Sequence, residues 1–236
     1  MIIIDNIDVT NMDRAIFSAR NPMNSWSKSD SFNCDNNECK FEKCPKWDNM
    51  VGGCGCSGGF IIGENDLSLM KKLVKAGTDH SKFMRMINVT VDITAPLYWW
   101  KEADTYKVGT VTNSCSTMHR LTAKEFTLDD FSHEHLLNVE KLKTVIQWLN
   151  EYRTIYLNWD DNKIYHDDNG NPINKKDIWW QMIQLLPSSY NQRRTMQMNY
   201  AVLRNIYHSR KDHKLDCWKD FCKWIETLPY SELITD

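Results

Sequence analysis

The most constraining feature of this chain is an alternating segment, Phe83–Thr94, that runs into the pair Ala95-Pro96. From Asn88 onward, valine or isoleucine occupies every second position, and polar side chains occupy the positions between them. Side chains of a strand point to alternate faces, so this period of two predicts a strand with one buried and one polar face. Pro96 disfavours a helical conformation in the residue before it and therefore marks the end of the strand.

Helical periodicity surrounds this strand. Periods near 3.6 residues predict helices over 13–20, 66–76, 134–156, 177–186, 193–208 and 216–228, with Asp13 and Ser132 as caps of the first and third. A first strand is expected at Ile2–Ile4, and residues 158–173 are typical of a hairpin that turns at Asp168-Asn169-Gly170. Because helices outweigh strands and the strands fall mostly in the first half, the predicted class is α+β.

The charge balance excludes some classes of partner. The 236 residues include 29 basic and 31 acidic side chains, a net charge of −2 that gives no global attraction to polymeric nucleic acid or to an anionic membrane. No apolar run approaches the roughly 20 residues of a membrane span. The start, Met1-Ile2-Ile3-Ile4, is followed at once by Asp5 and does not have the basic beginning of an export signal. We therefore expect a cytoplasmic protein whose eight cysteines are reduced thiols or metal ligands.

The segment Asn21–Gly59 has no regular periodicity and is rich in Asn, Ser, Asp, Gly and Cys, as loops and insertions are. Five of its residues are cysteines: Cys34, Cys39, Cys44, Cys54 and Cys56. Thiolates in such a loop are candidate zinc ligands, because metal bonds can replace a missing hydrophobic core. Their spacing contains no Cys-x2-Cys pair, so a flexible loop that carries cysteines without a metal stays the alternative.

Polar and aromatic side chains gather between Ala95 and His119. Trp99 and Trp100 would stack on a flat ring or pack as a pair in the core. Asn113, Ser114, Ser116 and Thr117 offer hydroxyls and an amide within one short segment. A nucleophilic serine needs a neighbouring base, and the sequence supplies no clear partner for Ser116.

A stripe with polar ends and an apolar middle follows the helix expected at 193–208. Asn199, Leu203, Ile206 and Arg210 fall on one face of that helix. Arg193 and Arg194 lie at its expected start, where backbone N–H groups favour an anion. Since the arginine fork donates two parallel hydrogen bonds, these residues are candidate phosphate ligands; the alternative is that they are solvated or salt-bridged.

Four blocks of the sequence resemble the flavin-dependent thymidylate synthases, the ThyX family: Ala15–Arg20, Asp66–Pro96, Ala95–His119, and Leu186–Arg210 followed by His213 and Trp218. In that family an arginine stands six residues before an asparagine, and a second arginine stands eleven residues after it. Arg193, Asn199 and Arg210 reproduce this spacing. The resemblance implies an α+β, ThyX-like (thymidylate-synthase-complementing-protein-like) fold, with a mixed or antiparallel sheet and long helices. It also implies one domain over 1–236, with insertions at about 21–59 and 158–176, and a homotetramer whose active sites are shared between subunits.

The resemblance further implies an enzyme that methylates C5 of dUMP reductively, using methylene-tetrahydrofolate, reduced FAD and NADPH. The residues that it assigns to the pyrimidine nucleotide are Glu102, Asn113, Ser116, Arg193 and Arg210, with Ser116 and Arg210 as the catalytic pair. Those that it assigns to the flavin are His80, Lys107, Asn199 and His208.

The sequence departs from this family at one signature. The family has Arg-His-Arg, then seven residues, then serine; this chain has Thr105-Tyr106-Lys107 with eight residues before Ser116. Two other functions therefore stay open: a different C5 modification of a pyrimidine nucleotide with another cofactor, and a nucleotide-binding protein without catalytic activity.

Overall fold

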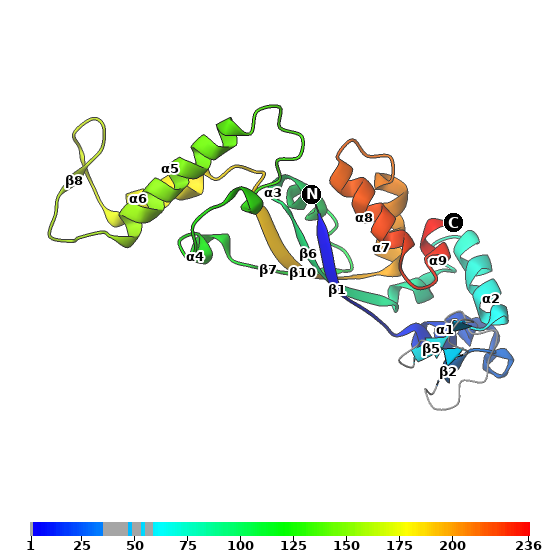
Figure 1. The fold of residues 1–236 in the computed structure, drawn as a ribbon. Coiled ribbons are helices and arrows are strands. Elements are labelled where there is room, and N and C mark those ends of the chain that lie inside the picture. The colour runs from blue at the N-terminus through cyan, green and yellow to red at the C-terminus, as the bar shows by residue number, and fades with distance from the viewer. Residues whose placement is uncertain (1, 35–46, 49–52, 55–58) are drawn as a thin grey trace.

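A four-stranded antiparallel sheet in the order β1-β6-β10-β7 forms the centre of the fold (Figure 1). The computed structural model describes residues 2–34, 47–48, 53–54 and 59–236. The strands of the sheet are Ile3–Thr10 (β1), Asn88–Pro96 (β6), Asn191–Asn199 (β10) and Thr110–Ser114 (β7). β6 pairs with β1 and β10, and β10 also pairs with β7, so β6 and β10 are the two central strands.

The alternation in the sequence separates the two faces of this sheet. Val89, Val91 and Ile93 of β6 are fully buried, and the polar residues between them are partly exposed. β10 alternates in the same way over its second half, where Met196 and Met198 are buried. One face of the sheet therefore forms part of the core, and the opposite face carries polar side chains.

Helices share one core with the apolar face. Their bounds are Met12–Arg20 (α1), Glu64–Lys75 (α2), Leu97–Ala103 (α3), Tyr200–Arg210 (α7), Asp216–Glu226 (α8) and Glu232–Thr235 (α9). Of these, α3 and α7 contact the sheet itself. Trp99, Trp100 and Trp218 are buried at the centre of this layer, and the rings of Trp99 and Trp218 lie 4.8 Å apart. The adjacent tryptophans are therefore a core pair rather than a stacking surface. No helix that the structure describes is long and apolar enough to cross a membrane.

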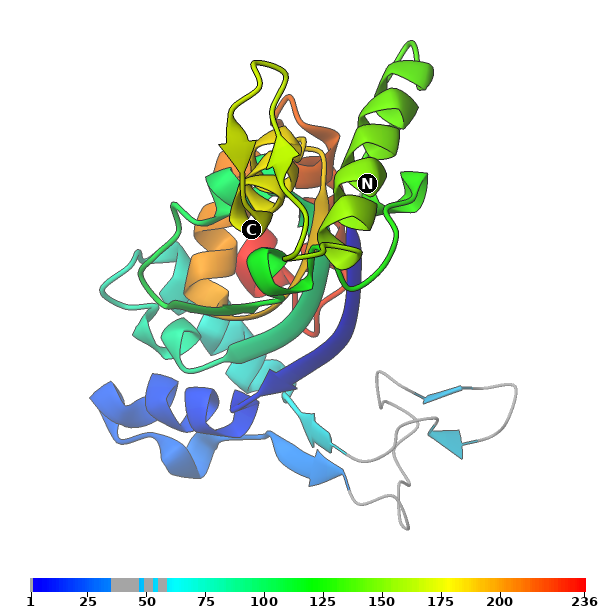
Figure 2. The ribbon, with the colours of Figure 1, turned by 90° about the vertical axis from the view of Figure 1, so that its left-hand side faces the viewer.

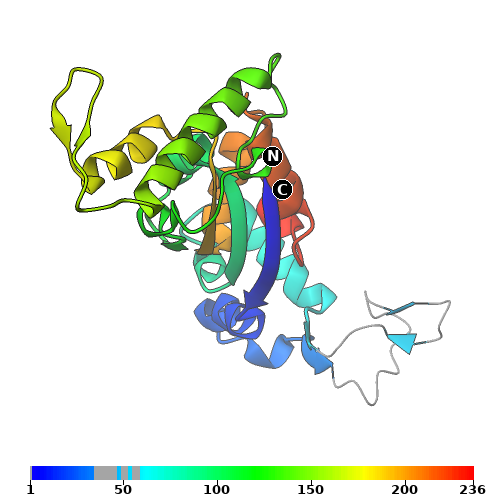
Figure 3. The same cartoon turned by 60° about the vertical axis from the view of Figure 1, so that its left-hand side comes forward.

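A second unit of the fold is an arm made of α5 (Glu140–Leu157) and α6 (Lys175–Leu185). Figures 1 and 3 show the two helices side by side, projecting from the sheet with a hairpin at the far end. The hairpin pairs β8 (Tyr165–His166) with β9 (Pro172–Ile173), and Gly170 takes the left-handed conformation of its turn, as predicted. A separate apolar cluster fills the base of the arm and includes Leu149, Met182 and Phe131.

A buried ion pair anchors the N-terminal part of the chain. Asp66, at the start of α2, is fully buried and accepts a 2.5 Å hydrogen bond from the Arg20 guanidinium at the end of α1. It also accepts hydrogen bonds from the hydroxyls of Ser29 and Ser31. Burial raises the pKa of Asp66, but the hydrogen bonds from Ser29, Ser31 and Arg20 outweigh burial and hold this pKa below its usual value.

This anchor lies next to a short ribbon in which β2 (Phe32–Cys34) pairs with β5 (Gly59–Ile61). Figure 2 shows α1 and the ribbon on the lower side of the sheet. Two further short strands, Trp47–Asp48 (β3) and Gly53–Cys54 (β4), pair with each other. A further short helix, α4, spans Thr117–Arg120.

The predicted helix over 193–208 is wrong in its first half. Residues 191–199 form β10, and α7 begins at Tyr200 with Asn199 as its N-cap. Arg193 and Arg194 are therefore strand residues and do not lie at a helix N-terminus. Pairing with β6 on one side and β7 on the other satisfies the backbone of this segment, which decides in favour of the strand.

Two predicted caps are also wrong. Asn11, in the left-handed conformation, is the N-cap position of α1, and Asp13 lies in the first turn. The long helix begins at Glu140 rather than near 134, because Ser132 is held elsewhere: its backbone N–H donates to the Ser189 carbonyl, and its hydroxyl donates to the Asn191 side chain.

The zinc prediction falls largely outside the described residues. Cys39, Cys44 and Cys56 are not among them, and Cys34 and Cys54 are described only as strand residues. Within the described part of the chain, no three His, Cys, Asp or Glu side chains are grouped so that they could hold a metal ion.

Candidate functional site

A pocket of about 630 Å³ opens beside Ser116, between the start of β10 and the segment that follows β7. Its polar lining includes Ser116, Arg120, Lys124, Asp130, Gln192 and Arg193. This volume lies within the range of roughly 300–1,000 Å³ that small-molecule sites occupy. The structure thus brings Ser116 and Arg193, far apart in sequence, to one cavity.

The ladder between β10 and β7 positions Ser116. Beyond the end of β7, the backbone N–H of Cys115 donates to the Arg193 carbonyl at 3.0 Å. The Gln192 side chain donates to the Cys115 carbonyl at 2.8 Å and to the Thr117 hydroxyl at 3.1 Å. Gln192 therefore fixes the residues on both sides of Ser116, a role that the sequence did not reveal.

The three cations of the pocket differ in how they are neutralised. Lys124 forms an ion pair with Asp130. Arg193 donates to both oxygens of Asp5, at 3.0 and 2.5 Å, and to Asp92 at 3.0 Å. No ion pair or hydrogen bond to another described residue holds the guanidinium of Arg120, which is exposed. Arg120 is therefore the cation most available to an anionic ligand.

Arg193 belongs to a network on the polar face of the sheet. Hydrogen bonds from Thr195, Asn6 and Arg193 lower the pKa of Asp92 to about 2. Hydrogen bonds to Asp5 and Asp92 raise the pKa of Arg193 in turn. Asn113 of β7 stands opposite Thr195 in the ladder and is exposed. The guanidinium of Arg193 therefore links β10 to β6 and β1 through hydrogen bonds and stabilises the sheet in this structure.

A second polar cluster surrounds Arg210 at the end of α7. One carboxylate oxygen of Glu102 accepts hydrogen bonds from Arg210 Nη1 at 3.0 Å and from Trp218 Nε1 at 2.9 Å. The His213 ring nitrogen Nε2 lies 3.5 Å from the same oxygen. Arg210 Nε donates to the Tyr106 hydroxyl at 3.0 Å, and the guanidinium lies 4.9 Å from the centre of the Trp218 ring. Glu102 and Arg210, which the resemblance assigns separately to the nucleotide, are in direct contact.

Arg193 and Arg210, the two arginines that the resemblance assigns to the nucleotide, lie on opposite faces of the sheet. Arg194, whose side chain points away from that of Arg193, lies 4.3 Å over the Trp100 ring on the core side. Arg210 packs on Trp218 of that same core. Arg193 and Arg210 of one chain therefore do not hold the same phosphate group.

The four residues that the resemblance assigns to flavin are only partly grouped. Asn199 caps α7 by accepting from the Val202 N–H at 3.0 Å, and its side chain lies against Gly109, two residues after Lys107. His80 is exposed in the turn after α2. His208 is largely exposed on α7, where partial desolvation and then the positive charges of Arg204 and Lys211 lower its pKa. The cavity at Lys107 measures about 220 Å³, which is too small for a dinucleotide. The described residues of one chain therefore do not fit a whole FAD.

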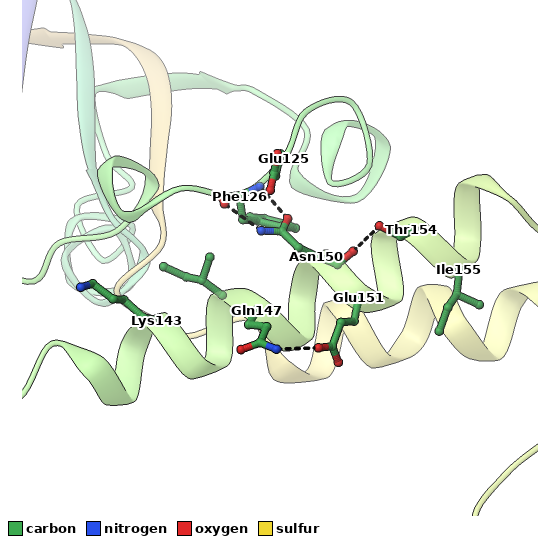
Figure 4. A pocket seen from close by; sticks show the side chains of 9 residues that line it. Glu125, Phe126, Lys143, Gln147, Asn150, Glu151, Thr154 and Ile155 are labelled. Atoms are coloured by element: carbon green, nitrogen blue, oxygen red, sulfur yellow. Dashed lines mark hydrogen bonds between the residues drawn. The ribbon is translucent and has the colours of Figure 1, made fainter.

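Another cavity, of about 780 Å³, runs along α5 (Figure 4). Several of its polar groups are already paired: Asn150 exchanges hydrogen bonds of 2.8 and 2.9 Å with the Phe126 backbone, and Gln147 donates to Glu151 at 2.9 Å. None of the residues predicted to carry chemistry lines this cavity. We therefore consider the pocket beside Ser116 the better candidate.

Comparison with solved structures identifies the architecture. Thymidylate synthase X (ThyX) from Helicobacter pylori, solved with FAD and dUMP, aligns with 100% of this chain and 96% of its own at 14% identity and a TM-score of 0.60. A second H. pylori ThyX complex with the same ligands gives 15% identity and the same TM-score over 99% and 97% of the two chains. The fold is that of ThyX.

The same fold also occurs in an enzyme with a related substrate. The UMP/dUMP methylase PolB from Streptomyces cacaoi, bound to 5-Br UMP, aligns over 100% of this chain and 94% of its own at 13% identity and a TM-score of 0.54. No protein-family model and no curated protein matches the sequence. At such identities the likeness establishes the fold alone, and confirms the predicted α+β, ThyX-like class.

Proposed function

We propose that this protein is an enzyme that modifies C5 of a pyrimidine nucleoside monophosphate, with dUMP as the substrate. The observation that carries the proposal is the pocket beside Ser116, which presents Arg120, a cation with no side-chain partner among the described residues, at the position where the ThyX resemblance expects the nucleotide. Its volume of about 630 Å³ accommodates a nucleoside monophosphate. Both ThyX neighbours were solved with dUMP, and PolB with 5-Br UMP, which supports the same substrate class here.

The chemistry of the pocket lining supports a phosphate ligand on a polar ring. Arg120 supplies a guanidinium fork for phosphate, which Lys124 in its pair with Asp130 does not. Ser116 supplies a hydroxyl that can donate and accept hydrogen bonds near the acceptor-rich edge of a pyrimidine, and the Gln192 amide holds the residues on both sides of it. The share of these residues in catalysis would be to bind and orient the nucleotide, which lowers the entropic part of the barrier.

We further propose that a second copy of the chain completes the site, as expected for a homotetramer with shared active sites. The positions of Arg193 and Arg210 on opposite faces of the sheet support this arrangement, because two copies allow one nucleotide to meet residues of both faces. The flavin would then be held between copies, near Lys107 and Asn199, and would supply the hydride chemistry. Methylene-tetrahydrofolate as carbon donor and NADPH as reductant belong to this version of the proposal.

Two measurements on the purified protein test the proposal. Dissociation constants for dUMP and thermal stability with and without dUMP test the substrate, since a ligand that binds only the folded state raises the melting temperature. Absorbance in the flavin bands, before and after addition of FAD, tests the cofactor. A protein that neither binds dUMP nor is stabilised by it would refute the nucleotide proposal. A colourless protein that binds dUMP but is unaffected by FAD would leave a C5 modification with another cofactor.

One observation favours nucleotide binding without catalysis as the second candidate. Tyr106, in the segment that replaces the Arg-His-Arg signature, accepts a hydrogen bond from Arg210, and Thr105 donates to the carbonyl of Glu102. These two residues thus serve local structure. Binding of dUMP without tritium release from its C5 position, in the presence of FAD, NADPH and methylene-tetrahydrofolate, would favour this candidate.

A further inference from the structure

Arg210 is held on two of its three nitrogens. Nε donates to the Tyr106 hydroxyl and Nη1 donates to Glu102, each at 3.0 Å. Nη2 makes no hydrogen bond to another described residue, and the side chain retains 21% of its exposure. The guanidinium also lies over the ring of Trp218, 4.9 Å from its centre. Its plane is thus fixed while one donor group stays open to a ligand.

Glu102 is the residue on which this arrangement converges. Its Oε2 atom accepts from Arg210 of α7 and from Trp218 of α8, and it lies within ion-pair distance of His213 in the turn between those helices. Glu102 itself comes from α3, so one carboxylate joins three elements. Such an arrangement fixes an arginine more firmly than packing alone, because the charge-assisted hydrogen bond has a defined direction.

We infer that Glu102 is a positioning residue, which orients Arg210 so that Nη2 binds an acceptor oxygen of the nucleotide. The inference rests on the proposed function for its ligand. It also changes the role of Glu102, since a carboxylate that already accepts from Arg210 and Trp218 holds the arginine rather than facing the base. Arg210 is the residue that meets the substrate, and Glu102 acts through it.

A double-mutant cycle on dUMP affinity separates this role from a purely structural one. Glu102→Ala removes the acceptor and is expected to weaken dUMP binding about tenfold, the lower end for loss of a charged hydrogen bond. Glu102→Gln keeps an acceptor oxygen and should stay within about threefold of the wild type. In an Arg210→Ala background, Glu102→Ala should have no further effect. Additive losses, or tighter binding by Glu102→Ala, would overturn the inference, the latter because Glu102 would then compete with the nucleotide.

A measurement without nucleotide tests the geometry directly. The Nη1–H resonance of Arg210, assigned by its absence in Arg210→Lys, should exchange slowly with water in the wild type and in Glu102→Gln, because Nη1 is the nitrogen that donates to residue 102. It should broaden or disappear in Glu102→Ala; an unchanged resonance there would overturn the positioning role. A wild type that binds no dUMP would refute the proposed function and the substrate role of Arg210 together, whereas additive losses in a wild type that binds dUMP would refute the inference alone.

The acceptor on the nucleotide is either a phosphate oxygen or a ring carbonyl, and deoxyuridine distinguishes them. If Glu102→Ala weakens deoxyuridine as much as dUMP, Nη2 binds the ring. If only dUMP is weakened, Nη2 binds the phosphate. An equal affinity of wild type and Glu102→Ala for both ligands would overturn the inference.

Discussion

Replacement of Arg120 by alanine tests the pocket beside Ser116 most directly. Around this pocket Lys124 is paired with Asp130, and Arg193 is paired with both Asp5 and Asp92. Without Arg120, the three carboxylates of these pairs outnumber the two cations by one, so a phosphate would be surrounded by a net negative charge. A charge-assisted hydrogen bond contributes about 1.5–3 kcal/mol. The loss corresponds to a rise in the dissociation constant for dUMP of about tenfold to 150-fold.

The assay is isothermal titration of dUMP at two salt concentrations, with Lys124→Ala as the matched control. Lys124 lines the same pocket, but its charge is already neutralised by Asp130, so its loss should change the affinity by less than about fivefold. The salt dependence of binding should weaken in Arg120→Ala only, because an exposed charge contributes through a screened interaction. An Arg120→Ala variant that binds dUMP as the wild type does, or a Lys124→Ala variant that loses as much, would refute the assignment of Arg120.

Three further predictions concern stability. Asp66→Asn removes the anionic partner of the buried Arg20 guanidinium and should lower the free energy of unfolding by about 3–5 kcal/mol in urea titrations at pH 7. Because the folded pKa of Asp66 is depressed, this difference should shrink as the pH falls below about 4. Gly109→Ala should cost about 1–3 kcal/mol, since Gly109 has φ of +77° and an added Cβ would lie 3.0 Å from Asn199 Nδ2; a melting temperature equal to that of the wild type would contradict this. Asp92, with a folded pKa of about 2, contributes stability that is present above its unfolded pKa near 3.9 and is lost as the pH falls through about 2. Urea midpoints of wild type and Asp92→Asn should therefore converge between about pH 4 and pH 2.

The sequence predicts those parts of the site that depend on residues close to one another in the chain. The Ala95-Pro96 pair correctly marks the end of β6, before the segment that carries Ser116. The resemblance assigns Glu102 and Arg210 separately to the nucleotide, and their contact with each other comes from the structure. The sequence pattern does not single out Arg120, because this residue lies outside the family signature. One signal was present: Arg120 stands four residues after Ser116, the spacing of one helical turn, and its N–H donates to the Ser116 carbonyl.

The segment from Arg193 to Asn199 shows why other features escaped prediction. Polar and apolar side chains alternate over residues 195–198, which fits a strand. The segment runs without a break into α7, however, so the sequence pattern predicts one continuous helix. The hydrogen bonds that decide between the two come from β6 and β7, about 100 and 80 residues earlier in the chain. Local propensity does not contain that information.

By itself, the sequence determined the elements whose period is visible within a few residues: the buried face of β6, the stripe of α2, the Gly170 turn and the α+β class. Only the tertiary structure decided which charges are available. In the sequence, Arg193, Arg210 and Arg120 are the same residue type. In the structure, Arg193 is bound by Asp5 and Asp92, and Arg210 is held by Glu102. The side chain of Arg120 has no partner among the described residues. The physical reason is that an ion pair depends on distances of a few ångströms between segments that only folding brings together.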